Sequence, residues 1–342
     1  MSPDRPTGPR LLIHALGGGL GHLQRSLALA RALSERGAEA VILHSGLLAP
    51  DALAERVADF ATLITLPSPV ALGGREAWRA HLRTQLIALS EPGVFAALVI
   101  DTFAEGLLGE LGPGSPPEAQ LWPAKRILVR RARRTPEVPE ALRRCALILE
   151  PGEAPAAPAP EGVPVVRTAP WLIAGPDELL PRRSARRVLG LDADPGLPLI
   201  GVIGSGTGAE IEDLAAAAEG LRAALSERAE VLLLDPRTPE AAARWPLLGL
   251  LPAFDLVIGA GGYNTVYECR ATRTPLLALA RRRKHDDQAA RLGPRERVRS
   301  LAELPARVAL ELTRLGSRAE RRPAFRHGAG DAAEAVLRMV EG

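Results

Sequence analysis

Short apolar runs recur along the first part of the chain, and each is closely followed by a glycine, a proline or a polar residue. They predict buried strands at residues 10–15, 38–44, 62–66, 96–100, 127–129 and 146–149. Residues 23–36 instead carry apolar positions at helical spacing and end at Gly37. A strand, a glycine turn, a helix and a second strand in this order are typical of a βαβ unit, so we expect a parallel sheet here.

The same order returns farther along the chain. Residues 150–164 are rich in Pro, Ala and Gly and lack periodicity, and a new apolar pattern begins at residue 199. This pattern predicts strands at residues 199–203, 231–234, 254–258 and 276–280, and helices at residues 209–228 and 332–340. Two such patterns in series predict an α/β protein of two Rossmann-like domains, whose parallel sheets face each other across a cleft.

The length of the chain supports two domains, because 342 residues exceed one typical core. We expect an N-terminal domain over residues 1–165 and a C-terminal domain over residues 166–320. The last segment, residues 321–342, is expected to carry a helix that crosses back to the N-terminal domain.

Composition narrows the class of protein. Hydrophobic residues make up 46% of the chain and charged residues 24%, as in ordinary globular proteins. The net charge of +3 is small and aromatic residues make up only 3%, which argues against nucleic-acid binding. Arginine-rich runs at residues 130–134, 182–187 and 281–284 are expected to be solvated faces. The last run lies close enough to Asp286 to meet an anionic substrate.

Several other classes are disfavoured. The two cysteines, Cys145 and Cys269, are too few for a disulfide framework or an all-cysteine zinc site. The sequence has neither a signal segment nor an apolar run long enough to span a bilayer, so we expect a cytoplasmic protein, with peripheral membrane contact left open. The run Asp192-Ala193-Asp194 is flanked by Pro and Gly and is interpreted as a turn; no metal and no cofactor is expected.

A glycine-rich turn follows the first predicted strand. It contains Gly17, Gly18, Gly19 and Gly21 and leads directly into His22. Free backbone N–H groups at such a turn suit a diphosphate, although tight turns in other α/β proteins have the same composition. His22 is the candidate catalytic base, with a structural or phosphate-binding role as the alternative. Arg25 stays charged and is therefore a candidate partner for a phosphate or a carboxylate.

Asp101 ends a buried strand, at the edge where open α/β sheets bind their ligands. One interpretation is that its carboxylate orients an acceptor or contacts a phosphate. The other is that Asp101 or Thr102 caps a helix that follows the strand.

Three polar groups follow strands of the second half. The first is a loop formed by Gly204, Ser205, Gly206 and Thr207, which offers backbone and hydroxyl donors to phosphate but lacks the lysine of a Walker loop. The second is a turn of Gly261 and Gly262 that opens a helix with Asn264, Thr265 and Glu268. A carboxylate in that helix suits ribose hydroxyls. The third is the pair Asp287 and Gln288, whose acid and amide groups suit vicinal sugar hydroxyls.

Together these motifs resemble the GT-B glycosyltransferases, most closely the MurG-type (family 28) N-acetylglucosaminyltransferases and related predicted glycosyltransferases. The resemblance rests on the Gly17–His22 turn, the turn and helix from Gly261 to Glu268, and the Asp287-Gln288 pair. Thr274-Pro275 stands where the family has Gly-x-Pro. The turn with His22 and Arg25 is also similar to that of PseG-type nucleotide-sugar hydrolases.

The resemblance implies a glycosyltransferase that takes a nucleoside diphosphate sugar, with UDP favoured, and passes the sugar to an unidentified acceptor. It implies that Glu268 holds ribose, the glycine loops hold the diphosphate, and Asp287 with Gln288 holds the sugar. Transfer is expected to invert the anomeric carbon and to need no metal. A hydrolase, an epimerase, and a nucleotide-sugar sensor or inactive partner subunit remain alternatives.

Overall fold

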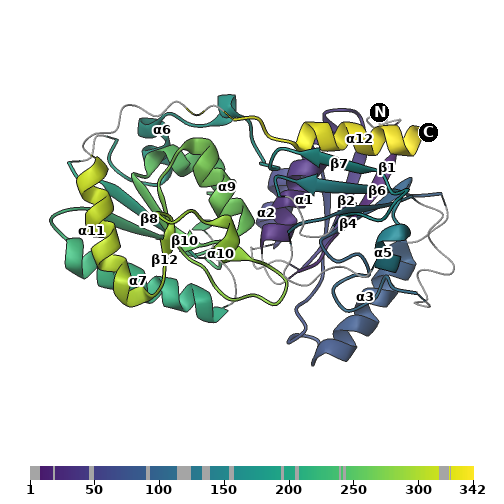
Figure 1. Ribbon diagram of the computed structural model, residues 1–342, viewed down its shortest axis with the longest axis horizontal. Coiled ribbons are helices and arrows are strands. Elements are labelled where there is room, and N and C mark those ends of the chain that lie inside the picture. The colour runs from purple at the N-terminus through teal and green to yellow at the C-terminus, as the bar shows by residue number, and fades with distance from the viewer. Residues whose placement is uncertain are drawn as a thin grey trace.

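The computed structural model describes residues 8–17, 20–45, 50–89, 93–113, 125–132, 139–153, 158–193, 196–204, 208–238, 240–241, 244–315, 323 and 325–342. Within these residues the chain forms two parallel sheets with helices packed on them, one sheet in each half of an elongated molecule (Figure 1). This is the predicted pair of Rossmann-like domains.

The first sheet has seven parallel strands in the order β3-β2-β1-β4-β5-β6-β7. Their bounds are β1 Arg10–Ala15, β2 Glu39–His44, β3 Thr62–Thr65, β4 Ala97–Asp101, β5 Lys125–Val129, β6 Leu147–Pro151 and β7 Val165–Thr168. The central strands are apolar along nearly their whole length because both faces of the sheet are covered.

The second sheet has five parallel strands in the order β12-β11-β10-β8-β9. Their bounds are β8 Leu199–Ile203, β9 Glu230–Leu234, β10 Leu256–Ala260, β11 Leu276–Leu279 and β12 Arg297–Val298. Strand β10 begins two residues later than predicted, because Phe254 ends the preceding 3₁₀ helix.

The α-helices of the first half are α1 Leu20–Ser34, α2 Pro50–Val57, α3 Arg75–Leu89 and α5 Pro139–Arg143. Those that follow are α6 Arg182–Val188, α7 Gly208–Leu225, α9 Tyr263–Thr272, α10 Gln288–Arg291, α11 Leu304–Leu315 and α12 Ala329–Glu341. Short 3₁₀ helices are η1 Pro176–Glu178, η2 Leu247–Ala253 and η3 Leu301–Glu303.

Two strands escaped prediction. Strand β7 is short and only partly buried, and β12 has two residues, one of them exposed. Edge strands of this kind lack the continuous apolar run that marks a central strand, so periodicity does not reveal them. Strand β7 belongs to the first sheet and extends past residue 165. The exact domain limits stay a prediction.

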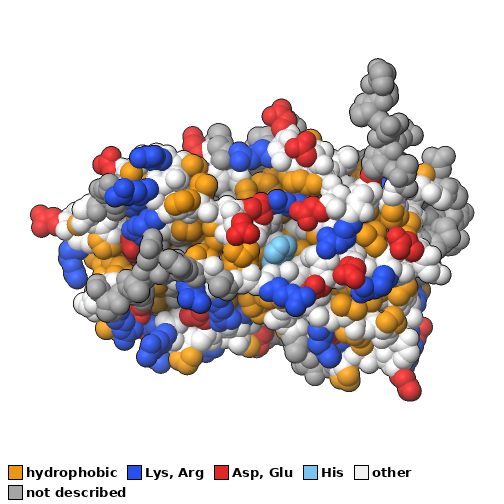
Figure 2. All heavy atoms as spheres, turned by 90° about the horizontal axis from the view of Figure 1, so that it is seen from above, with side chains coloured by type: hydrophobic (Ala, Val, Ile, Leu, Met, Phe, Trp, Pro, Cys, Tyr) orange, Lys and Arg blue, Asp and Glu red, His pale blue; other side chains and the backbone are white. Residues whose placement is uncertain are grey.

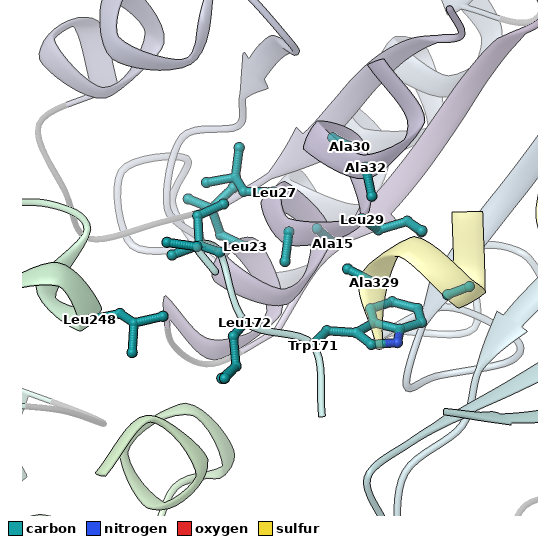
Figure 3. Packing of buried hydrophobic residues seen from close by; sticks show 14 of the residues in the cluster. Ala15, Leu23, Leu27, Leu29, Ala30, Ala32, Trp171, Leu172, Leu248 and Ala329 are labelled. Atoms are coloured by element: carbon teal, nitrogen blue, oxygen red, sulfur yellow. The ribbon is translucent and has the colours of Figure 1, made fainter. Parts of the chain in front are cut away.

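One hydrophobic cluster connects the two halves (Figure 3). It includes Leu23 of α1, Leu172 between β7 and η1, and Leu248 of η2. Helix α12 packs against α1 and β7, with Ala329 buried near Trp171. The predicted return of the final helix to the N-terminal half is therefore confirmed.

Charged side chains of both signs are interspersed over the face shown in Figure 2, with hydrophobic side chains scattered among them. Among the described residues, no helix is both long and apolar enough to cross a membrane.

Candidate active site

A cavity of about 400 Å³ lies between the two halves of the molecule. The N-terminal half contributes the start of α1 and the loops after β4 and β5, through Leu20, Gly21, His22, Gln24, Thr102, Phe103 and Arg131. The C-terminal half contributes the ends of β8, β9 and β10, the start of α9 and the loop before α10. All of these lie at the carboxyl ends of parallel strands, where this kind of fold binds ligands.

The imidazole of His22 is held by Asp101. Its Nδ1 lies 2.5 Å from Oδ2 of Asp101, and its side chain is 16% exposed. Because an ionised carboxylate only accepts hydrogen bonds, the Nδ1 carries the proton and donates it to Asp101. The Nε2 is then the nitrogen that can accept a proton, which is the state a general base requires.

Asp101 is itself bound by Arg25. The guanidinium donates from Nε to Oδ1 at 3.0 Å and from Nη2 to Oδ2 at 2.6 Å, and both side chains are almost completely buried. Burial alone would raise the pKa of Asp101, but Arg25 and His22 hold that pKa well below its usual range. Burial lowers the pKa of His22, with Asp101 acting in the opposite direction.

These contacts correct one sequence interpretation. Asp101 does not cap a helix, since residues 102–113 form turns rather than a helix. Of the two partners predicted for Arg25, the structure shows a carboxylate, since its guanidinium donates to Asp101 and also to Thr102, and Arg25 does not line the cavity.

Glu268 lies on α9 and faces the cavity from the opposite half. It is only 5% exposed, and Gln24 of α1 donates from Nε2 to its Oε1 at 2.5 Å. Burial raises the pKa of Glu268 to about 7, and the hydrogen bond from Gln24 opposes the rise only in part. A carboxylate with so little compensation is suited to hydroxyl donors from a ligand.

The start of α9 opens onto the same cavity. Gly262 takes the N-cap position without any side-chain cap, and Asn264 and Thr265 of the first turn also line the cavity. Uncapped N–H groups and the positive end of the helix dipole favour an anion. Gly261 lies behind this turn, where a β-carbon would come within 3.2 Å of Gln288, so the close packing favours glycine.

Other predicted phosphate contacts divide into two sets. Gly21 and Gly204 line the cavity. The remaining ones lie outside the described residues, namely Gly18, Gly19, Ser205, Gly206 and Thr207. Asp194 of the predicted turn also lies outside them.

Of the predicted sugar-binding pair, one residue lines the cavity and the other does not. Gln288 is buried and lines the cavity, with its Oε1 accepting from the backbone N–H of Arg281 at 2.8 Å. Asp287 is not among the lining residues, and its carboxylate accepts from the N–H of Ala290 as the N-cap of α10. Its neighbour Asp286 lines the cavity instead.

A buried ionic group ties the two halves together beside the cavity. Arg131 and Glu153 come from the N-terminal half, and Asp286 and Arg291 come from the C-terminal half. Asp286 lies 2.7 Å from Nη2 of Arg291 and 3.4 Å from Nη2 of Arg131. Arg291 also pairs with Glu153. The ring of Tyr263 lies against Arg131, with the guanidinium carbon 4.8 Å from the ring centroid.

Sequence reasoning missed several of these residues. Gln24, Phe103, Arg131 and His285 line the cavity, yet none has a distinctive spacing in the sequence. Arg131 also overturns a prediction, since it lies in an arginine run expected to be solvated and is only 9% exposed. Its position directly after a predicted strand was the available signal, because strand ends at this edge carry function.

Within the described part of the chain, no cluster of three or more His, Cys, Asp or Glu side chains is arranged to hold a metal ion.

The arrangement of two facing Rossmann-like domains with a returning final helix is the GT-B fold, and solved structures match it over nearly the full length. The glycotransferase of kitacinnamycin is 17% identical with a TM-score of 0.60, covering 98% of this chain and 100% of that chain. TcCGT1 in complex with UDP is 13% identical with a TM-score of 0.58, covering 98% and 99%. MurG of Acinetobacter baumannii is 13% identical with a TM-score of 0.50, covering 97% and 99%. At these identities the likeness establishes the fold.

No protein-family model matches the chain, and no curated protein matches it in sequence.

Proposed function

We propose that the chain is a glycosyltransferase that moves a sugar from a nucleoside diphosphate sugar to an acceptor hydroxyl or amine. The observation that carries this proposal is the placement of a His22–Asp101 pair and of Glu268 with the start of α9 on opposite sides of one cavity. A base on one wall and an anion-binding helix start with a buried acid on the other suit an acceptor and a donor that meet between them.

In this proposal Nε2 of His22 takes the proton of the acceptor as the acceptor oxygen or nitrogen attacks the anomeric carbon. The bond from that carbon to the diphosphate oxygen breaks on the opposite side, so the anomeric configuration inverts. Asp101 keeps the imidazole in the required tautomer and stabilises the charged form that results.

The C-terminal half binds the donor in this proposal. Glu268 accepts hydrogen bonds from the ribose hydroxyls, and the start of α9 with Gly262 faces the diphosphate. Arg283, which pairs with Glu210, and Lys284 also line the cavity, and in this proposal they supply positive charge to the leaving group in place of a metal. We assign the sugar contacts to Gln288 and Asp286 because both line the cavity, and Asp287 remains a candidate with its carboxylate engaged at α10.

A UDP-sugar is the favoured donor, in line with the sequence resemblance and with the UDP bound in the TcCGT1 structure. The sugar is taken to be a hexose by the same resemblance.

The test is to incubate the purified protein with UDP-, GDP- and dTDP-sugars, with and without a panel of acceptors, and to follow products by mass. A transferase releases nucleotide and forms a glycosylated acceptor, and it does so in the presence of EDTA. Release of free sugar without any acceptor would instead identify a hydrolase, and interconversion of donors an epimerase. Nucleotide binding without turnover would indicate a sensor or an inactive partner subunit.

A further inference from the structure

The residue next to Asp101 has an unusual backbone. Thr102 has φ of 71°, a left-handed value that β-branched residues rarely adopt. The N–H of Phe103 donates to the carbonyl of Asp101 at 2.9 Å, so the three residues form a γ-turn with a positive central φ, the strained form of this turn. Strain of this kind persists where the surroundings impose it, and it clusters at functional sites.

The turn brings the side chains on either side of Thr102, those of Asp101 and Phe103, into contact with the imidazole of His22. Asp101 holds the Nδ1 of His22, while the ring of Phe103 stacks on the same imidazole with the centroids 5.8 Å apart and the planes 20° apart. In an ordinary strand, residues two apart also lie on one face, but the tight reversal at Thr102 lets both converge on a single small ring.

Gly17 lies against the same imidazole of His22. A β-carbon at this position would lie 2.0 Å from Cδ2 and 2.2 Å from Nε2 of His22, far inside any permitted contact. The imidazole therefore occupies the space that a side chain at Gly17 would need. Unlike Phe103, Gly17 does not line the cavity, so it has no direct route to a substrate.

We propose that Gly17, Thr102 and Phe103 are positioning residues that fix the orientation of the His22 imidazole. The catalytic consequence rests on the proposed function, while the orientation itself rests on these contacts. Gly17 gives the cleanest test because, unlike Thr102 and Phe103, it does not line the cavity. Comparison with and without His22 separates an effect on the imidazole from an effect on the turn itself.

The experiment is a double-mutant cycle with Gly17→Ala, His22→Ala and the double variant. Gly17→Ala alone is expected to lower kcat roughly a hundredfold, as loss of a general base does, with donor Kd changed less than about threefold. In the His22→Ala background the same change should alter kcat by less than about twofold, because no ring remains to be displaced. Gly220→Ala, at an open position on α7, is the matched control and should leave kcat unchanged.

Equal losses in both backgrounds would overturn the proposal, since they would show that the alanine disrupts the turn as such. An unchanged kcat in Gly17→Ala would overturn it as well. If Gly17→Ala fails to fold, Phe103→Leu serves in the same cycle, because leucine keeps the apolar contact and removes the stacked ring. Phe103→Leu is then expected to lower kcat several-fold only when His22 is present.

A readout independent of activity separates this inference from the proposed function. The imidazole titration of His22, followed by NMR, reports the surroundings of the ring, where Asp101, Arg25 and Arg131 are the charged neighbours. In the wild-type protein the pKa lies below the ordinary value because the ring is buried. In Gly17→Ala the displaced ring should titrate with a pKa closer to the ordinary one. An unchanged titration would overturn the positioning role, whereas full turnover in His22→Ala would overturn only the proposed catalytic role.

Discussion

Asp101, which lies behind His22, and Glu268, which lines the cavity, are two carboxylates with nearly equal burial and opposite electrostatics. Their exposures are 1% and 5%, so desolvation opposes ionisation in both. Arg25 and His22 hold the pKa of Asp101 well below its usual range, whereas the pKa of Glu268 rises to about 7 with Gln24 as its hydrogen-bond donor. The charged partner, rather than the depth of burial, decides the ionisation state.

The two carboxylates therefore differ in how far the protein itself stabilises their charged forms. Both oxygens of Asp101 are engaged within the protein, so its charge is fixed before any substrate arrives. Among the described residues no cation pairs with Glu268, and hydroxyl donors from a ligand would supply the stabilisation that is missing there. The following predictions test this contrast, from the largest expected effect to the smallest.

Asp101→Asn replaces the charged carboxylate of the N-terminal half by a neutral amide, so the electrostatic difference from Glu268 is lost. Loss of the charge removes the acceptor that fixes the His22 tautomer, so kcat should fall by roughly a thousandfold or more. Arg25 also loses its counter-charge while buried, which should lower the free energy of unfolding by about 3 kcal/mol. Turnover and urea unfolding measure the two effects. Asp59→Asn, an exposed position, is the control. A kcat within tenfold of the wild-type value would contradict the role of Asp101 in fixing the His22 tautomer.

The raised pKa of Glu268 predicts a pH dependence of stability. Between its ordinary value of 4.5 and about 7, the folded protein binds more protons at Glu268 than the unfolded chain does. Stability should therefore fall as pH rises through this window, by about 3 kcal/mol in the absence of ligand. Urea unfolding of the wild-type protein and of Glu268→Gln at pH 5 and pH 8 measures it.

The comparison with Glu268→Gln is needed because His22 acts in the opposite direction. The lowered pKa of His22 means that the folded protein binds fewer protons there as pH approaches 6.5, so its contribution to stability rises with pH. Both proteins share that contribution, and it cancels in the difference. If the wild-type protein and Glu268→Gln lose stability equally between the two pH values, the buried acid does not titrate in this window.

The fold was predictable because its central strands are covered on both faces. Strand β1, with residues 11–15 buried, is apolar there except for His14, and the glycine turn that follows it marks where the helix begins. The same reasoning found β10 and α9. It found one edge strand of each sheet, β3 and β9, and missed the other, since β7 and β12 are short and half-exposed.

Less of the candidate site than of the fold could be predicted from the sequence, since its contacts join residues that lie far apart along the chain. His22 and Asp101 are 79 positions apart, and they meet because β1 and β4 are neighbours, which periodicity alone does not reveal. Choosing between Asp286 and Asp287 requires knowing where α10 begins, because the N-cap residue turns its carboxylate to the backbone. Their roles in catalysis remain predictions.

Glu268→Ala tests the donor side of the contrast. If ribose hydroxyls donate to this carboxylate, its loss should weaken nucleotide affinity by roughly ten- to a hundredfold, equivalent to about 1.5–3 kcal/mol. Turnover at saturating donor should change little, since the interaction is made equally before and during reaction. Calorimetric titration with nucleoside diphosphates measures the affinity. Glu227→Ala, an exposed residue beyond α7, is the control, and equal affinities for both variants would contradict the role.

Gln24→Ala should have the smallest effect of these changes, and that effect should be on the pKa of Glu268. Gln24 is the donor that stabilises the ionised form of Glu268 across the cavity, so its removal should raise the pKa of that acid above about 7. The pH window of falling stability should then extend upward by up to about one unit, equivalent to about 1.4 kcal/mol near pH 8. Urea unfolding at intervals between pH 6 and pH 9 locates the midpoint, with Gln85→Ala of α3 as the control. The direction of this shift is the test, because loss of the hydrogen-bond donor disfavours the charged carboxylate. A midpoint that stays at the wild-type value would mean that Gln24 does not donate to Glu268 in solution, and the two halves would then lack this link through α1 and α9.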